Sequence, residues 1–271
     1  MPNASLIHIV ERLSSAAAPQ AADSRNSGTC GQLFRGLSPE SLEFLLSRAH
    51  TNLYQAHEEI IRQGEDPRSL FLILSGQVKT VRYNAEGQET TIRMLQAGET
   101  FMDAIIFMGG GSPVNAVAIE NCELLCIPTA TVRAHILRDP QFASNLLHIV
   151  TNHYKNAMQQ IDNISIKTPV ERLGYYLLRQ HLEQGADSLE FNLPFQKSMI
   201  ANHLGMTPET FSRALAQIKK SGIDIEQKHI SMRDIFALCH FCDPDLSAMC
   251  PRSNSSECPN GESCGKGGCP H

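Results

Sequence analysis

Four glycines recur at nearly equal intervals in the first half of the sequence, and they restrict the fold more than any other feature. Gly64, Gly76, Gly87 and Gly98 lie 12, 11 and 11 residues apart. The runs LFLIL, QVKTVRY and ETTIRML lie between them, and AVAI and CELLCI follow. Short β-rich runs separated by turn residues at such intervals are typical of an all-β sandwich or barrel. We therefore predict a jelly-roll-like β-roll within residues 33–138, preceded by a flexible segment over residues 1–32.

One helix is expected before these strands in the sequence and another after them. Ser38 followed by Pro39 is typical of a helix start, because proline suits the first helical position. After the strands, apolar side chains recur at steps of three and four residues, which favours pairing with a second copy. We predict a dimerisation helix over 139–167; the alternative is that its stripe packs on the chain's own β-domain. The stripe consists of Phe142, Leu146, Ile149, His153, Ala157, Ile161 and Ile164.

A capping box marks the boundary of a second domain. Thr168 and Glu171 can cap each other's backbone amides, and Pro169 suits the first helical position between them. The runs that follow predict helix, strand, helix, helix and hairpin over 168–238, giving an α+β chain overall. In the pair of helices, Ala201 is small enough for a close crossing and Gly205 supplies the positive φ of a tight turn. We predict a winged helix-turn-helix.

The second helix of that pair has the residue types of a DNA reader. Thr207 can cap it, with Pro208 at its first position, and Phe211, Leu215 and Ile218 are expected to point inward. The opposite side can read bases, because arginine pairs with guanine and glutamate accepts from cytosine. The alternative is a solvated face with an i, i+4 ion pair. The candidate DNA-binding residues are Thr207, Glu209, Thr210, Ser212, Arg213, Lys219 and Lys220.

The net charge of the chain limits the kinds of DNA binding that can be expected. The chain carries a formal net charge of -5, which argues against nonspecific coating of nucleic acid. Residues 168–238 contain eight Lys/Arg and eight Asp/Glu, so the predicted reader domain is locally neutral. No apolar run suggests a membrane span and no basic, apolar leader opens the chain, so we expect a cytoplasmic protein without a membrane partner.

The whole arrangement resembles the Crp/Fnr superfamily of bacterial transcription regulators over residues 33–238. GEDPRSLFLILSGQVKTVRYNAEGQETTIRMLQAGETF is similar to the family's glycine-marked roll, and Glu209, Ser212 and Arg213 resemble the E-x-x-S-R pattern of the Fnr and Dnr branches. The resemblance implies a homodimer that binds double-stranded DNA at TTGAT-N4-ATCAA-like palindromes and acts with RNA polymerase. Pro208 departs from the cyclic-AMP receptor branch, which has arginine there.

The resemblance also bears on the signal. Where relatives bind a cyclic phosphate, this chain has Asp103 and then Pro113 and Val114, without an arginine, so we predict no cyclic nucleotide. Gly109–Gly111 is interpreted as a turn. FMDAIIFM resembles the Dnr-type branch, which implies haem as a cofactor without naming its ligands. The histidines of the roll and long helix are interpreted as surface or packed residues: His50, His57, His135, His148 and His153.

A cysteine-rich tail occupies residues 239–271. Thiolates at such spacing can hold an iron-sulfur cluster or zinc, and the spacing does not choose between them. The alternative is a tail with redox-labile thiols. The rival function is a thiol or metal redox protein built on Cys239-x-x-Cys242, but no catalytic constellation appears and we expect no enzyme. The candidate metal ligands are Cys239, Cys242, Cys250, Cys258, Cys264 and Cys269.

Overall fold

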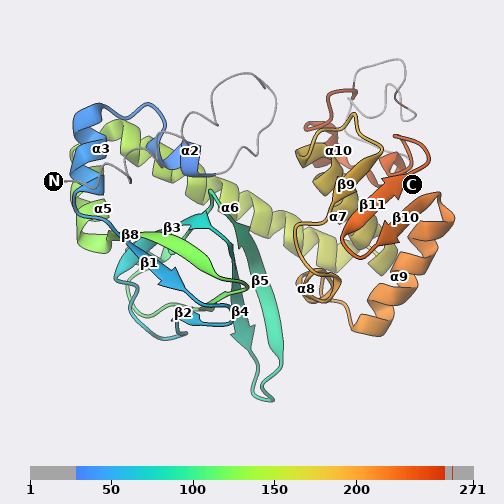
Figure 1. The fold of residues 1–271 in the computed structure, drawn as a ribbon, viewed down its shortest axis with the longest axis horizontal. Helices are drawn as coiled ribbons and strands as arrows, with labels where there is room; N and C mark the ends of the chain where they lie inside the picture. Colours follow the sequence, from blue (N-terminus) through green and yellow to red (C-terminus); the bar gives the residue numbers. More distant parts are fainter. Residues whose placement is uncertain (1–28, 254–257, 259–271) are drawn as a thin grey trace. The chain divides into compact units, whose positions relative to one another are not determined.

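The computed structural model describes residues 29–253 and Cys258, which form two compact units that meet in the chain between Met158 and Gln159 (Figure 1). The segment predicted to be flexible, 1–32, lies outside the described residues except for its last four. Those four belong to α2 (Thr29–Phe34), so the boundary predicted at residue 33 falls inside a helix. None of the described helices is both long enough and apolar enough to cross a membrane.

The first unit is a roll of two antiparallel sheets, as predicted. All five predicted runs are strands, and their order within each sheet requires crossovers between the sheets. Strands β1, β2 and β6 were not predicted; β1 reads HTNLY and is largely exposed, so it has no apolar alternation to detect. One sheet has the order β1 (His50–Tyr54), β8 (Cys122–Pro128), β3 (Ser69–Ser75) and β6 (Thr100–Phe101), and the other β2 (Glu59–Ile61), β7 (Asn115–Ala118), β4 (Gln77–Tyr83) and β5 (Glu89–Gln96).

The evenly spaced glycines lie at turns, as the sequence indicated. All four have positive φ, a backbone region that side chains with a Cβ rarely adopt. Gly76 is also required for space, because a Cβ there would lie 2.5 Å from the carbonyl oxygen of Asn121. Gly111 is the tightest of the later group, since its Cβ would lie 2.1 Å from the carbonyl oxygen of Gly64. The Gly109–Gly111 stretch is therefore explained as a turn.

Short helices pack against the strands of the roll. The predicted helix is α3 (Pro39–Leu46), and its N-cap Ser38 accepts from the amide of Ser41. The helices α4 (Ile105–Met108) and α5 (Thr129–Ile136) were not predicted. Leu33, Leu45 and Phe142 are fully buried in one core with the strands, so the helices before and after the roll are part of its hydrophobic core.

The long helix α6 (Pro140–Ile166) has two apolar faces rather than the single stripe predicted. Phe142, Leu146 and Ile149 are buried in the core of the roll, which confirms the alternative of packing on the chain's own domain for that part. The prediction of one continuous seam was wrong, because the first half of the predicted stripe is buried in the roll while Ala157, Ile161 and Ile164 are exposed. The exposed face consists of Leu147, half-buried Val150, Tyr154, Ala157, Ile161 and Ile164, at alternating steps of three and four.

A buried hydrogen-bonded cluster ties three helices of the first unit together. The Ser41 hydroxyl donates to the Asp139 carboxylate and therefore accepts from His135 Nε2, 2.6 Å away. His135 Nδ1 has no partner among the described residues, so the ring is neutral with its proton on Nε2. The cluster lacks the order of a catalytic triad, in which the carboxylate orients the other ring nitrogen. The cluster therefore has a structural role: its hydrogen bonds hold the helices together.

Because His135 belongs to this buried cluster, we expect the protein to lose stability in mild acid. Burial lowers the pKa of His135, with the charge of Asp139 opposing it, so the unfolded chain binds the proton more readily and stability falls as the pH drops through the ordinary histidine range. Between about pH 7.5 and about pH 5.5, urea titrations should show a decreasing free energy of unfolding. His135→Gln should reduce that decrease, while exposed His148→Gln should not. An unchanged slope in His135→Gln would exclude this role.

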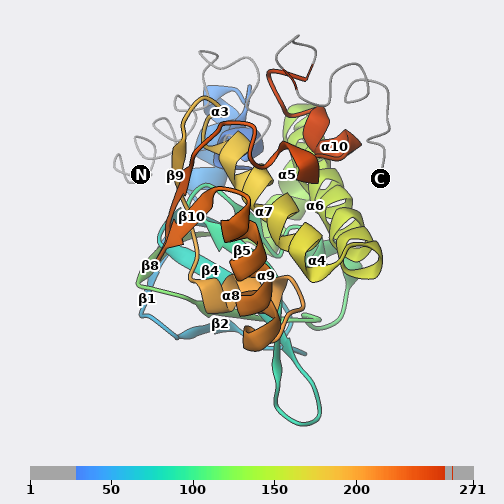
Figure 2. The same cartoon turned by 90° about the vertical axis from the view of Figure 1, so that its right-hand side faces the viewer.

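The second unit is the predicted winged helix-turn-helix, seen in Figure 2 from the side of β10 and α9. Thr168 and Glu171 form the predicted capping box at the start of α7. The three strands form a sheet of order β10-β11-β9, and a short tail structure follows. The elements are α7 (Pro169–Glu183), β9 (Glu190–Asn192), α8 (Lys197–His203), α9 (Pro208–Lys220), β10 (Ile223–Glu226), β11 (His229–Met232), η1 (Cys239–Phe241) and α10 (Pro244–Ser247).

Candidate nucleic-acid interface

The turn between α8 and α9 has the geometry that the sequence predicted. Gly205 has a φ of 65°, and Ala201 is buried where the two helices cross. The amide of Met206 donates to the carbonyl of Ala201 at 2.9 Å. Thr207 caps α9 by accepting from the amide of Thr210. The start of α9 is therefore fixed by local contacts of its own residues.

Helix α9 separates a buried face from an exposed one. Phe211 and Ile218 are buried, as predicted, whereas Leu215 is only half-buried and Ala214 takes the inner position beside them. The predicted reading residues Glu209, Ser212 and Arg213 are exposed within the first two turns. This half of the helix is the one whose side chains reach base edges in helix-turn-helix proteins.

The charges on this face suit base recognition. The pKa of the Glu209 carboxyl lies below its ordinary value, because its own backbone amide and the Thr207 hydroxyl donate hydrogen bonds to it and the charge of Arg213 is near. The carboxylate is therefore an acceptor at neutral pH. Glu209 and Arg213 are both exposed and four residues apart, so the solvated face with an i, i+4 pair stays the alternative to base reading.

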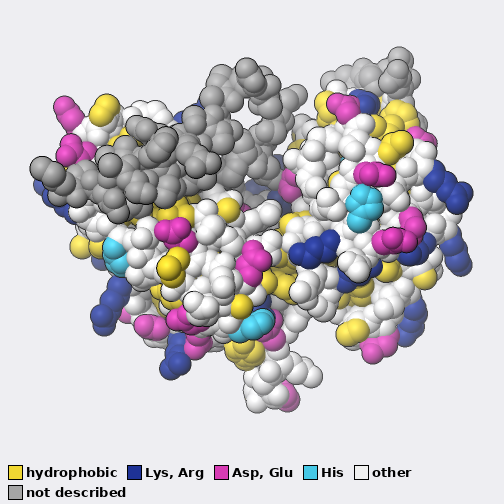
Figure 3. Space-filling view, in the orientation of Figure 1, with side chains coloured by type: hydrophobic (Ala, Val, Ile, Leu, Met, Phe, Trp, Pro, Cys, Tyr) yellow, Lys and Arg dark blue, Asp and Glu magenta, His cyan; other side chains and the backbone are white. Residues whose placement is uncertain are grey.

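The remaining candidates are held in the free protein by local contacts. The Ser212 hydroxyl donates to the carbonyl of Pro208 at 2.8 Å, and the Thr207 and Thr210 hydroxyls lie 3.1 Å apart. Lys219 forms an ion pair with Asp224 of the wing at 3.0 Å, so it must exchange that partner before it meets a phosphate. Lys220 is exposed. Figure 3 shows Lys and Arg side chains interspersed with acidic ones along this edge of the unit, consistent with its neutral charge.

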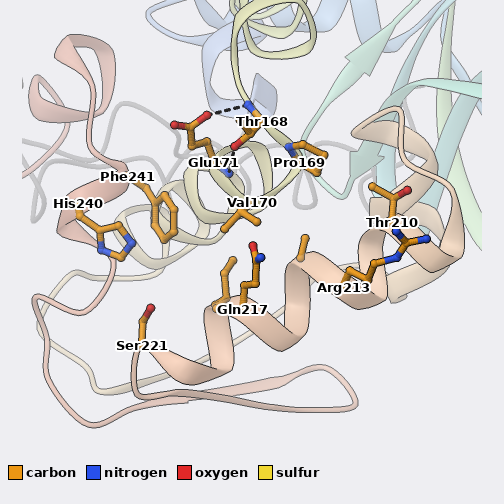
Figure 4. A pocket seen from close by; sticks show the side chains of 12 residues that line it. Thr168, Pro169, Val170, Glu171, Thr210, Arg213, Gln217, Ser221, His240 and Phe241 are labelled. Atoms are coloured by element: carbon orange, nitrogen blue, oxygen red, sulfur yellow. Dashed lines mark hydrogen bonds between the residues drawn. The ribbon is translucent and has the colours of Figure 1, made fainter. Parts of the chain in front are cut away.

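An open groove of about 690 Å³ runs along α9 (Figure 4). Its walls are the start of α7, with Thr168 and Glu171, and η1, with His240 and Phe241. Arg213 lies at the end of the groove near the start of α9, and Gln217 lies further along it. The sequence did not indicate that His240 and Phe241 would be placed beside the reading helix, because that contact joins segments distant in the chain.

A second polar network joins the roll to α6. His153 Nδ1 lies 3.2 Å from Asp103 Oδ1, and Arg93 donates to His153 Nε2 at 2.9 Å. Since arginine only donates, Nε2 must accept and the proton lies on Nδ1. Burial acts to raise the pKa of Asp103, but the hydrogen bonds from His153 and Thr100 and the charge of Arg93 outweigh it, so the pKa is lowered. Asp103 is a buried carboxylate, and His153 is packed, as expected.

The predicted metal ligands lie partly outside the described residues. Cys239 and Cys242 are at the two ends of η1, and Cys242 is buried. Cys250 and Cys258 are half-buried, and Cys264 and Cys269 lie outside the described residues. Among residues 29–253 and Cys258, no three His, Cys, Asp or Glu side chains are gathered as they would be around a metal ion.

The fold and the comparisons define a DNA-binding transcription regulator with an N-terminal roll. Residues 51–139 match the family model of the cyclic nucleotide-binding domain, and residues 171–241 match that of the Crp-like helix-turn-helix domain. The cyclic AMP receptor protein of Thermus thermophilus is 32% identical over 191 residues, covering 70% of this chain and 87% of that protein. The chain belongs to the Crp/Fnr family.

Two further comparisons agree. The anaerobic regulatory protein of Pasteurella multocida is 30% identical over 189 residues, which cover 68% of either chain. The structure of FixK2 from Bradyrhizobium japonicum has the same fold, with a TM-score of 0.63 at 22% identity, over 71% of this chain and 96% of that one. These relatives confirm the fold class and the family predicted from the sequence.

Proposed function

We propose that this protein binds a TTGAT-N4-ATCAA-like palindrome as a homodimer and regulates transcription from it. The observation that carries the proposal is the exposed row of Glu209, Ser212 and Arg213 at the start of α9. Arg213 suits the guanine of each half-site, and the ionised Glu209 suits a cytosine amine. Thr207, Thr210, Lys219 and Lys220 contact phosphates, which positions the reader without adding sequence information. RNA polymerase is the partner that such a regulator needs in the cytoplasm, where bacterial DNA lies.

The exposed face of α6 supports the homodimer. Its a and d positions are apolar over three heptads, and Tyr154 and Ile161 are 68% and 57% exposed in the single chain. Two copies of such a face pack together as a two-stranded coiled coil. A palindrome has the same two-fold symmetry as that dimer, so each copy can read one half-site.

The signal is proposed to be oxygen, nitric oxide or redox state rather than a cyclic nucleotide. The support is the ionised Asp103, which is buried in the roll and held by His153 and Arg93. A phosphate brought to this position would meet a negative charge, while the guanidinium of Arg93 is already engaged with His153. One of the similar proteins has a name that points to anaerobic regulation, which is consistent with this class of signal.

Titration of a labelled duplex tests the proposal directly. The full chain should bind TTGAT-N4-ATCAA more tightly than a scrambled duplex of the same composition at the same salt concentration, by at least about 1000-fold for a specific regulator. Added cyclic AMP should leave both affinities unchanged. Equal binding to the two duplexes would contradict the function, and tighter binding with cyclic AMP would contradict the proposed signal.

A metal-binding tail is the second candidate, as part of the sensor or as the basis of a thiol or metal redox protein. The described residues gather no three donors, so a site among the six predicted cysteines needs Cys264 or Cys269 in addition to the described thiolates. Iron with sulfide, or zinc, should be found in protein purified without oxygen, and Cys239→Ser with Cys242→Ser should remove it. Haem, implied only by the resemblance, would show as a Soret band. Metal-free and haem-free protein with full DNA binding would contradict both sensor proposals.

A further inference from the structure

A strap of residues 238–253 crosses the DNA-binding unit after the wing. The match to the helix-turn-helix family model ends at residue 241, so most of the strap lies beyond it. Leu238 at its start and Leu246 at its middle are buried. Arg252 donates to the carbonyl of Ala186 at 2.9 Å and pairs with Asp187. The strap is therefore packed onto α7 and the loop that follows it.

Phe241 fixes the strap against α7. A Cβ at Gly174 would lie 2.3 Å from the atoms of the Phe241 ring, so the ring occupies a notch that only glycine leaves open. The same ring forms one wall of the groove along α9. The position of the strap is thus set by direct contact with the helix that supports the reader.

Asp243 connects the strap to the junction between α6 and α7. Lys167 is the residue between Ile166, where α6 ends, and the N-cap Thr168. Its ammonium donates to Asp243 Oδ2 at 2.7 Å and to Asn163 Oδ1 at 2.5 Å. It also lies 3.8 Å from the centroid of the Tyr175 ring. One side chain thus holds the last turn of α6, the first half of α7 and the strap.

The junction is connected in turn to the reading helix. The carbonyl of Lys167 accepts from Arg172 Nε at 3.0 Å, and another nitrogen of Arg172 donates to the carbonyl of Leu204 at 3.0 Å. Leu204 is the C-cap of α8, directly before the turn that leads into α9. A continuous path of hydrogen bonds therefore runs from Asp243 through Lys167 and Arg172 to the helix-turn-helix.

From this path we infer that Asp243 is a positioning residue for DNA recognition: through Lys167 it holds the α6–α7 junction in the arrangement that presents the reading helix. The inference rests on the proposed function. It also makes the strap, most of which lies beyond the matched helix-turn-helix model, part of the recognition apparatus of this chain. Cys239 and Cys242 lie in the same strap on either side of Phe241, and Cys242 directly precedes Asp243. A group bound to these cysteines would therefore act on this path of hydrogen bonds.

Asp243→Asn is the sharpest test, because asparagine keeps the N-cap of α10 and removes only the charge. The full-chain variant should bind the TTGAT-N4-ATCAA duplex roughly 5- to 10-fold more weakly, the lower part of the usual range of coupling between sites. Hydrogen exchange at residues 166–172 should become faster. Asp234→Asn is the matched control, since its carboxylate also accepts a backbone amide in the same domain, and it should change neither readout.

Charge reversal separates positioning from simple electrostatics. Asp243→Lys adds positive charge, which by itself would tighten DNA binding. Loss of the ion pair between Asp243 and Lys167 should instead weaken DNA binding. Combining Asp243→Lys with Lys167→Asp should restore much of the affinity. Tighter binding by Asp243→Lys, or no rescue in the double variant, would overturn the inference. If the unaltered protein bound no palindrome, the proposed function would fail, and unchanged exchange in Asp243→Asn would overturn the positioning role separately.

Discussion

Arg213→Ala is expected to cost about 1 to 3 kcal/mol of binding free energy at the TTGAT-N4-ATCAA duplex for each guanine contact removed. The reason is that a bidentate guanidinium-guanine pair is the strongest single contact available to this face of α9. Arg213 is exposed and forms part of the groove wall rather than the core, so the fold should be unaffected. A dimer carries the change twice. Fluorescence anisotropy with specific and scrambled duplexes measures the loss.

The losses of affinity for specific and nonspecific duplexes show which side chain reads the base sequence. Arg213→Ala should weaken specific binding strongly and nonspecific binding little, and it should relax the preference for guanine at its position. Lys220→Ala is the control: an exposed cation at the end of α9 should weaken all duplexes alike and reduce the dependence on salt. Full specific affinity in Arg213→Ala would mean that another surface reads the sequence.

Ile161→Glu is expected to convert the proposed dimer to monomers. Position 161 is an a position of the exposed α6 face, so a dimer would bury two carboxylates opposite each other. An unpaired buried charge costs roughly 3 kcal/mol or more, which raises the dimer dissociation constant by about 100-fold or more. Light scattering after size exclusion measures the mass directly, and binding to the palindrome should fall with it.

Leu137→Glu provides the control for this seam. Leu137 is 88% exposed at the end of α5, away from the heptad positions of α6, so its variant should remain dimeric and bind DNA normally. A dimer that survives Ile161→Glu would show that the copies associate elsewhere. Monomers that still bind the palindrome tightly would show that reading does not need the pair.

Local patterns predicted the elements whose signals are contained within a few residues. The capping box of Thr168 and Glu171, the turn at Gly205 and the cap at Thr207 are all present, because each depends on neighbours along the chain. Strand β1 was missed because its residues are polar and exposed. The single seam on α6 was wrong for a different reason: a helix with two apolar faces has no unique stripe until its neighbours are known.

The residues of the candidate site also fall into two groups, those predicted from local patterns and those that depend on contacts between distant residues. The reading residues follow from spacing on one helix, and their exposure follows from its amphipathic pattern. The network of Asp103, His153 and Arg93 joins side chains up to 60 residues apart, and no periodicity links such positions. The contact of Phe241 with Gly174 joins residues that are even further apart in sequence. The sequence therefore predicted the candidate reading residues but not the distant contacts that hold their helix in place.

The close fit of Phe241 against Gly174 has a consequence for related chains. A side chain at 174 and a ring at 241 cannot occupy the same space, so the two positions should vary together across evolution. Glycine at the first should accompany an aromatic residue at the second wherever the strap is kept. Chains with a larger residue at 174 should have lost or rerouted their C-terminal extension, which gives a two-position signature for recognising this subgroup.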